Sequence, residues 1–106
     1  LLQQEQVGES SLTVRGRTCK ARQRQLARQG HTNAALPNDA VIAACQLTAP
    51  PRQWLEDAAN RLQLSARALH STLRVARTIA DLASEEAVTE AHLGEALAFR
   101  NPLLQQ

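Results

Sequence analysis

The chain of 106 residues lacks tyrosine and methionine, and it contains only one tryptophan, Trp54, and one phenylalanine, Phe99. β-Branched residues are few and scattered, whereas alanine and leucine carry most of the apolar content. Because aromatic and β-branched residues favour strands and alanine and leucine favour helices, we expect an all-α fold, a small bundle of about five helices. A chain of this length has room for one domain with a modest core.

Long apolar runs are also missing. No stretch approaches the run of about eighteen apolar residues that a membrane span needs, and no basic and then apolar leader opens the sequence. We therefore expect a cytoplasmic protein with no membrane partner. Because the sequence starts at Leu1 and contains no methionine, we also expect it to be a piece of a longer protein.

The residues that most catalytic or metal sites require are absent too. Lys20 is the only lysine, and its surroundings, GRTCK, lack the Gly-Lys-Ser/Thr ending of a phosphate loop, so the chain is not expected to hydrolyse ATP by itself. No nucleophile with its base, and no carboxylate pair on one face, indicates another enzyme. Cys19 and Cys45 lack zinc-site spacing, so we predict no metal site and two reduced core cysteines.

The charge that is present is unevenly distributed. Residues 1–38 carry a net charge of +4, residues 39–78 carry +2, and the remainder carries −4. Such polarity suits head-to-tail stacking of identical subunits as well as contact with a polyanion.

The first helix is expected to run from a cap at Ser10 or Ser11 to about Gln29. Residues 1–9 show no periodicity and are predicted to be a frayed, disordered leader, and Gly30 suits the C-terminal stop. The apolar face is narrow, so we expect the helix to be stabilised by packing against a partner. That face repeats every seven residues, at Leu12, Cys19 and Leu26.

Basic residues dominate this first helix. They are open to three interpretations, namely a solvated surface, a contact with another domain or subunit, and a contact with nucleic acid. The nucleic-acid signal is weak because no aromatic residues are interleaved with the cations. The candidate contact residues are Arg15, Arg22, Arg24 and Arg28.

Two shorter helices are expected to follow. Asn38 can cap the first of them, whose buried positions are Val41, Ile42, Ala44 and Cys45. Prolines are tolerated in a first turn, so Pro50 and Pro51 can open the next helix. Its spacing gives a buried stripe of Trp54, Leu55, Ala58, Ala59 and Leu62.

A fourth helix is expected over residues 65–83. Ser65 is a good N-cap, and Leu64 and Leu69 occupy the positions of a hydrophobic staple. Arg67 is then the second helical residue, where the helix dipole disfavours a cation by about 0.3–1 kcal/mol. Backbone N–H groups and a guanidinium in the same turn can clamp a phosphate. The alternative is that Arg67 meets water or a nearby acid.

Polar residues repeat along this helix at spacings of three and four, and we expect them to lie opposite its apolar face: Arg67, His70, Arg74, Arg77 and Asp81. Arg77 and Asp81 can pair at i, i+4. Ser65, Arg74 and Arg77 are further candidates for a phosphate or inter-subunit contact. Thr89 is expected to cap a fifth helix that packs back on the fourth, and residues 101–106 are expected to be a loose tail.

Three segments of this region resemble a known family. They are LSARA at 64–68, LRVARTIADL at 73–82, and HLGEAL at 92–97 followed by Arg100. They resemble the C-terminal end of the magnesium-chelatase-related AAA+ ATPases of the ComM/YifB type, and the resemblance extends back to about Gly8. It implies that residues 10–100 form the helical lid that follows a nucleotide-binding core. It also implies that Arg67 is the sensor-2 arginine, which approaches the γ-phosphate of ATP.

The resemblance further implies cofactors and partners. ATP and Mg would be held by the absent core of the same chain and not by this segment. Neighbouring subunits of a hexameric ring would be partners, and in ComM-like members the full protein would be a DNA helicase serving natural transformation. Two alternatives stay open, namely a free-standing helical nucleic-acid-binding domain and a protein-protein adaptor, which would expose an apolar patch with no arginine-lined cleft nearby.

Overall fold

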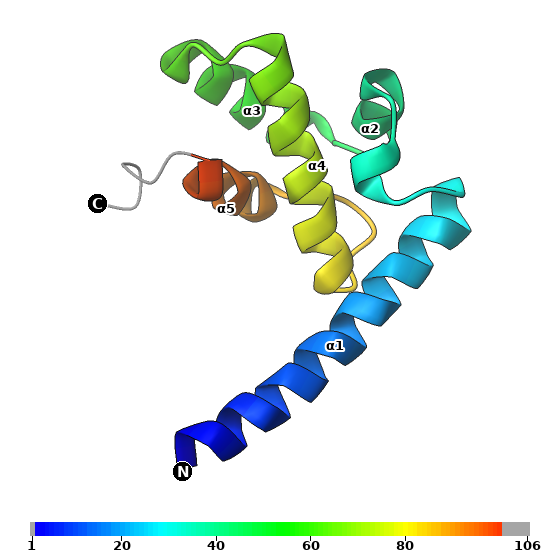
Figure 1. Cartoon of the computed structure of the whole chain (residues 1–106). Helices are drawn as coiled ribbons and strands as arrows, with labels where there is room; N and C mark the ends of the chain where they lie inside the picture. The colour runs from blue at the N-terminus through cyan, green and yellow to red at the C-terminus, as the bar shows by residue number, and fades with distance from the viewer. Residues whose placement is uncertain (1, 101–106) are drawn as a thin grey trace.

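Five α-helices and one short 3-10 helix make up the part of the chain that the computed structural model describes, which is the backbone of residues 2–100 and the side chains of residues 15–99 (Figure 1). Because no strand occurs in this part, the all-α prediction is confirmed. The elements are α1 (Leu2–Gln29), η1 (Asn33–Ala35), α2 (Asn38–Ala44), α3 (Ala49–Leu62), α4 (Ala66–Leu82) and α5 (Glu90–Arg100).

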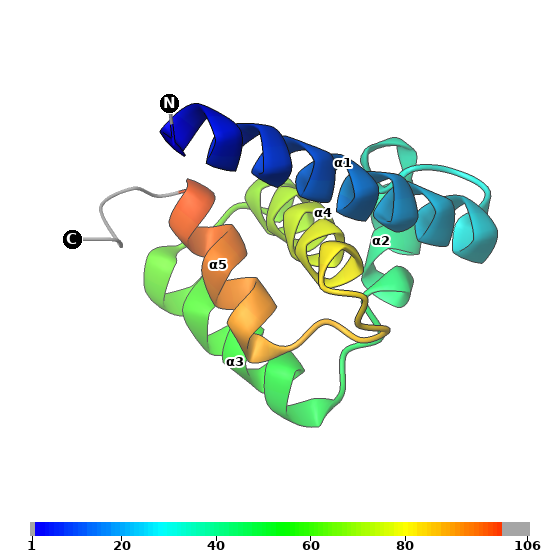
Figure 2. The same cartoon turned by 90° about the horizontal axis from the view of Figure 1, so that it is seen from below.

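Helix α4 lies at the centre, in contact with α1, η1, α2 and α5 (Figures 1 and 2). Leu73, Ala76 and Ala80 recur at spacings of three and four, and this spacing places them on the side of α4 that enters the core. As predicted, Leu93 and Ala96 of α5 pack back into this cluster. The buried members are Leu36, Val41, Cys45, Leu55, Leu73, Ala76, Ala80, Val88, Leu93 and Ala96.

Helix α1 begins at Leu2, which corrects the prediction of a cap at Ser10 or Ser11. The backbone of residues 2–9 continues the helix and does not form a separate leader. At the other end Gly30 has a φ of +75°, and its N–H donates to the carbonyl of Leu26 at 2.9 Å, so the predicted C-terminal stop is confirmed. The predicted tail, residues 101–106, lies outside the described residues.

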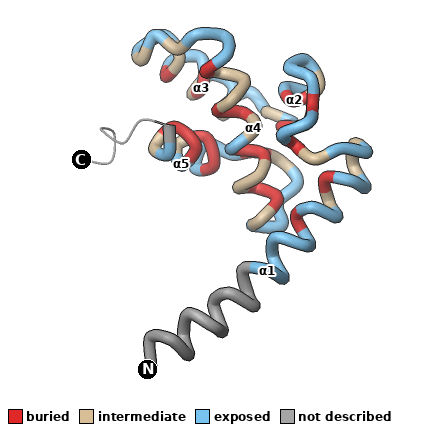
Figure 3. The backbone as a smooth tube through the Cα atoms, in the orientation of Figure 1, coloured by how far each residue is buried: buried red, intermediate tan, exposed pale blue. Residues whose placement is uncertain are grey.

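The face of α1 that packs on the bundle is not the predicted one. Ala21 and Gln25 are buried, whereas Cys19 is exposed and Leu26 is 45% exposed (Figure 3). The third member of the predicted stripe, Leu12, lies outside the described side chains. The prediction of two core cysteines is therefore right for Cys45 and wrong for Cys19. Polar contacts, described below, select the packed face.

Helix α2 also starts differently from the prediction. Asn38 is its first residue and does not cap it, since the N-cap is Pro37 and no side chain caps the helix. Ile42, predicted to be buried, is 42% exposed. Helix α3 carries its two prolines in the first turn, as expected. Within the described range, no helix combines the length and the apolar character needed to cross a membrane.

Candidate functional site

The start of α4 forms a candidate anion site. Ser65 caps the helix as predicted, because its Oγ accepts a hydrogen bond from the N–H of Ala68 at 3.1 Å. Arg67 is the second helical residue, its side chain is exposed, and it has no hydrogen bond or ion pair among the described residues. The N–H groups of Ala66 and Arg67 have no acceptor within the helix and lie at its positive end. A cation and free donors therefore meet at one open corner.

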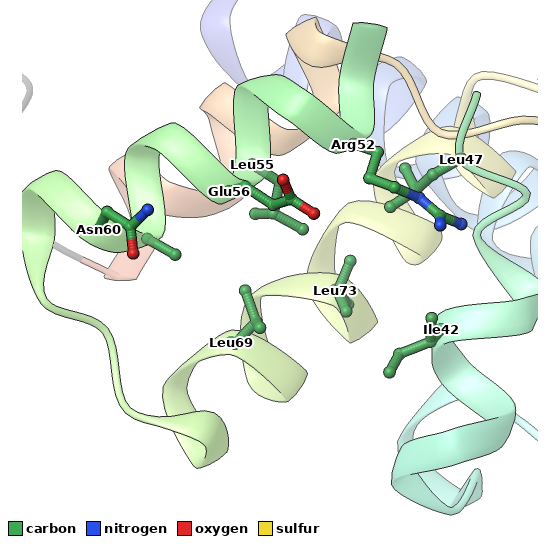
Figure 4. Close-up of a pocket in the computed structure, with 9 residues that line it drawn as sticks. Ile42, Leu47, Arg52, Leu55, Glu56, Asn60, Leu69 and Leu73 are labelled. Carbon is green, nitrogen blue, oxygen red and sulfur yellow. The ribbon is translucent and has the colours of Figure 1, made fainter. Parts of the chain in front are cut away.

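An apolar groove of about 410 Å³ lies next to this corner, between α2, α3 and α4 (Figure 4). Leu69, two residues after Arg67, lines the groove together with Leu73 of α4 and Leu55 of α3. The groove can receive an apolar group of a partner beside the anion site. Its polar edge comes from exposed residues of α3: Arg52, Glu56 and Asn60.

Arg74 does not extend the anion site, contrary to its candidate role. Its Nη2 donates to the carbonyl of Leu36 at 2.6 Å and to Oδ1 of Asn38 at 2.8 Å. The side chain therefore joins α4 to the start of α2. The same bond explains why Asn38 is not a cap, because its side-chain oxygen faces Arg74.

Arg77 is also not available for a ligand, because it is completely buried (0% exposed). Its Nη1 donates to the carbonyls of Ala44 and Glu86, and its Nη2 donates to the carbonyl of Glu85 at 2.7 Å. The predicted pair with Asp81 is confirmed at 3.0 Å, but both partners are buried. Arg77 therefore links α4 to the end of α2 and to the loop before α5.

Asp81 is the centre of a buried polar cluster. Arg28 of α1 donates to its two carboxylate oxygens at 2.9 and 3.2 Å, and Nδ2 of Asn33 donates to it at 3.0 Å. Asn33 also receives a hydrogen bond from Arg28 at 3.1 Å, and its N–H donates to Gln25 at 2.9 Å. Side chains from α1, η1 and α4 thus meet at a single carboxylate.

Contacts within the fold reduce the number of α1 cations that can bind another molecule. Arg28 is committed to Asp81, and Arg24 donates to the carbonyl of Ser84 at 3.3 Å. Arg15 and Arg22 are exposed and have no partner among the described residues. Of the four candidate contact residues, only these two are free to bind another molecule.

The charges of the cluster perturb one another. Burial raises the pKa of Asp81, but hydrogen bonds from Arg28 and Asn33 and the charges of Arg77 and Arg28 outweigh it, so the net pKa lies below the usual value. Burial lowers the pKa of Arg77, and the Asp81 carboxylate opposes this change. Burial raises the pKa of the Cys45 thiol to about 11. Asp81 is therefore held as a carboxylate between two guanidinium groups.

Thr89 caps α5, as predicted, in a reciprocal arrangement. The N–H of Thr89 donates to Nδ1 of His92 at 2.9 Å, and the N–H of His92 donates weakly to Oγ1 of Thr89 at 3.5 Å. This is a capping box in which histidine takes the place usually held by Glu or Gln. The other ring nitrogen of His92 lies 3.2 Å from the carboxylate of Glu85, which holds the preceding loop on α5.

Sequence reasoning missed the buried cluster, although one signal was present. Leu73, Arg77 and Asp81 follow one another at intervals of four residues, so the helical period places both charged residues on the same side of α4 as a core leucine. Within the described side chains, no three His, Cys, Asp or Glu residues gather as a metal site would require.

The fold and the site together define a small helical module with one open arginine at the capped start of its central helix. The chain belongs to the family described as magnesium chelatase, subunit ChlI C-terminal, whose model matches residues 8–100. It is 43% identical over 93 residues to the competence protein ComM of Haemophilus influenzae and, at the same identity, to the uncharacterized protein YifB of Escherichia coli. YifB of Salmonella typhimurium is 42% identical.

These matches cover 88% of this chain but only 18% of each relative. The chain therefore spans less than a fifth of the length of the curated proteins that it resembles. No solved structure matches the chain significantly.

Proposed function

We propose that this chain is the helical lid of a magnesium-chelatase-like AAA+ ATPase and that Arg67 is its sensor-2 arginine. The observation that carries this proposal is the contrast within α4. Arg74 and Arg77 are bonded inside the fold, whereas Arg67 is exposed and unpaired at the positive end of the helix. A cation at that position costs free energy unless an anion approaches it.

In this function a core elsewhere in a longer protein binds ATP and Mg, and the lid closes over the nucleotide. Arg67 then donates to the γ-phosphate, and its guanidinium stabilises the charge that develops during phosphoryl transfer. When the phosphate leaves, this contact is lost. Arg77 and Asp81 tie α4 to α1, α2 and the loop before α5, so the whole module moves with α4.

The length of the relatives supports a role within a larger protein, because the matched segment is 18% of each of them. We further propose that the full protein assembles with neighbouring subunits into a ring. In keeping with the resemblance to the ComM type, we propose DNA as the substrate of that motor.

The test is the Arg67→Ala variant of the full-length protein. Removal of one preorganised donor at a developing charge lowers kcat by about 10²–10³-fold, and we expect a loss of ATP turnover of that size. Arg67→Lys keeps the charge but not the bidentate geometry, so it should recover only part of the turnover. Arg17→Ala is the matched control, because Arg17 is also an exposed, unpaired arginine but lies on α1.

Circular dichroism of the 106-residue chain should show the same helix content and melting temperature for Arg67→Ala as for the parent sequence. Turnover that is unchanged in Arg67→Ala, with ATP bound at the same affinity, would refute the sensor role.

A further inference from the structure

We infer that two copies of this chain bind head to tail, with the outward face of α1 in one copy against the outward face of α5 in the other. The basic face is defined as Arg15, Cys19, Arg22 and Leu26, and the acidic face as Ala91, Glu95 and Phe99. This inference deepens the ring assembly proposed above by naming its contact surfaces, and it does not depend on the role of Arg67.

The four residues of the basic face share one side of α1. Their spacing of i, i+4, i+7 and i+11 aligns them along the helix, and all four are exposed, Leu26 to 45%. The side of α1 that packs on the bundle carries Ala21, Gln25 and Arg28 instead. The basic face is therefore free in the single chain.

The basic face has no acidic neighbour in the sequence of α1. The sequence contains no Asp or Glu between Glu9 and Asp39. Arg15 and Arg22 have no partner among the described residues, and the next cations along the helix, Arg17 and Lys20, are also exposed.

The acidic face has the opposite charge and the same mixture of charged and apolar side chains. Ala91, Glu95 and Phe99 lie at i, i+4 and i+8 on α5, and Phe99 is 70% exposed. Exposed Glu90 directly precedes Ala91 in the first turn of α5. Beside Phe99 a shallow groove of about 240 Å³ runs between α4 and α5, lined by Ser71, Thr72, Val75, Ala96 and Phe99.

The two faces are complementary in charge and in apolar character. Leu26 and Phe99 are the two most exposed large apolar side chains of the described part, and Leu26 lies on the basic face whereas Phe99 lies on the acidic face. Contact would bury Leu26 against Phe99 and the groove, and it would place Arg22 opposite Glu95. The interleaved apolar residues favour a protein partner over a nucleic acid, whose phosphates bind cations and whose bases stack on aromatic side chains.

The geometry of the single chain makes this contact repeatable. Both α1 and α5 pack on α4 (Figure 2). One copy therefore presents the basic face and the acidic face on one bundle. Because the two faces differ, the contact is heterologous, so each copy can bind one neighbour with each face.

The first experiment is sedimentation equilibrium of the 106-residue chain at low ionic strength, where exposed charges are least screened. We expect concentration-dependent self-association that weakens as salt is added. Arg22→Glu and Glu95→Arg should each weaken association about tenfold, since an attraction becomes a repulsion. The double variant Arg22→Glu/Glu95→Arg should restore it to within about twofold. Arg61→Glu, at an exposed position of α3 away from both faces and from the grooves, is the control and should leave association unchanged.

A cross-link locates the contact. Leu26 opposite Phe99 and Arg22 opposite Glu95 bring Cys19 opposite Ala91. Cys19 is exposed and Cys45 is buried, so Ala91→Cys with a short bismaleimide should join Cys19 of one copy to position 91 of the next. A dimer-sized band that disappears in Cys19→Ser is the expected result. Gln53→Cys, on the exposed side of α3, should give no such band.

Three results would overturn the inference. The first is a chain that stays monomeric at every concentration, and the second is a double variant that associates no better than the single ones. The third is binding of mixed-sequence single-stranded DNA that Arg22→Glu abolishes and Glu95→Arg leaves intact, because the basic face would then be a nucleic-acid surface. Association in Arg67→Ala should equal that of the parent chain, so loss of the sensor role and loss of this contact are separate outcomes.

Discussion

Arg67 and Arg77 show how position on one helix decides what an arginine does. Arg77 follows the core residue Leu73 by one helical turn, so its guanidinium enters the bundle, where three backbone carbonyls and Asp81 bond to its two terminal nitrogens. Arg67 lies in the first turn, where no other element of the described part bonds to it. The first arginine stabilises the fold, and the second is left for a partner.

Asp81→Asn should destabilise the chain strongly. The substitution keeps the shape of the side chain but removes the negative charge between Arg28 and Arg77, and Arg77 is completely buried. Loss of one partner of a buried ion pair costs about 3–5 kcal/mol. Urea unfolding at pH 7 measures this as a lower midpoint. Asp57→Asn, at an exposed position on α3, should change the free energy of unfolding by no more than about 0.5 kcal/mol.

The two cysteines should differ in reactivity by orders of magnitude. Cys45 is completely buried, and burial raises its pKa to about 11, so only about one thiol in 10³ is a thiolate at pH 8. Cys19 is exposed. A colorimetric disulfide reagent should titrate one thiol at once and the second only after unfolding in denaturant. Cys19→Ser should abolish the rapid phase, and two rapid equivalents in the parent chain would contradict this assignment.

At the scale of elements, the described side chains of α1 hold it to the bundle mainly by polar contacts. Arg28→Ala removes the two bonds to Asp81 and the bond to Asn33. Hydrogen bonds to charged groups contribute about 1.5–3 kcal/mol, and we expect a loss of stability in that range. Amide hydrogen exchange over residues 21–29 should accelerate more than exchange in the middle of α4. Arg22→Ala, on the exposed side of the same helix, should change neither the stability nor the exchange rates. Equal effects of the two variants would show that the bonds of Arg28 do not hold α1 to the bundle.

Local signals in the sequence predicted the helix starts and stops well. Ser65 and Thr89 cap their helices and Gly30 ends α1, because each effect depends on residues within one turn. The start of α1 and the cap of α2 were predicted wrongly. Helix α1 continues to Leu2 without a capping serine, and the oxygen of Asn38 is used by Arg74 from another helix.

The candidate site could be predicted only where it is local. The position of Arg67 follows from the cap at Ser65, two residues earlier, so the sequence was sufficient. Arg28, Arg74 and Arg77 were assigned to external contacts because their decisive partners lie in other elements. These partners are Asp81 of α4 for Arg28, the carbonyl of Leu36 for Arg74, and the carbonyls of Ala44 and Glu85 for Arg77. The periodicity of apolar residues cannot predict a cluster in which one buried carboxylate pairs with two guanidinium groups.

At the scale of the whole molecule, Asp81 should determine how the free energy of unfolding changes as the pH falls. Its pKa is lowered in the folded state, whereas an Asp in the unfolded chain has a pKa of about 3.9. The unfolded chain therefore takes up the proton first as the pH falls. The stabilisation from Asp81 is fully present above about pH 4 and is lost as the pH falls through the lower folded pKa.

The comparison of the parent chain with Asp81→Asn isolates this titration, because every other ionisable group is common to both. Urea unfolding should give a constant difference in the free energy of unfolding between about pH 7 and pH 5. The difference should shrink below about pH 4, since a protonated Asp81 has the same charge as asparagine. The free energy of unfolding of Asp57→Asn should match that of the parent chain at every pH. A difference that begins to close near pH 6 would mean that the pKa of Asp81 is raised, and the two guanidinium groups would then not determine its charge.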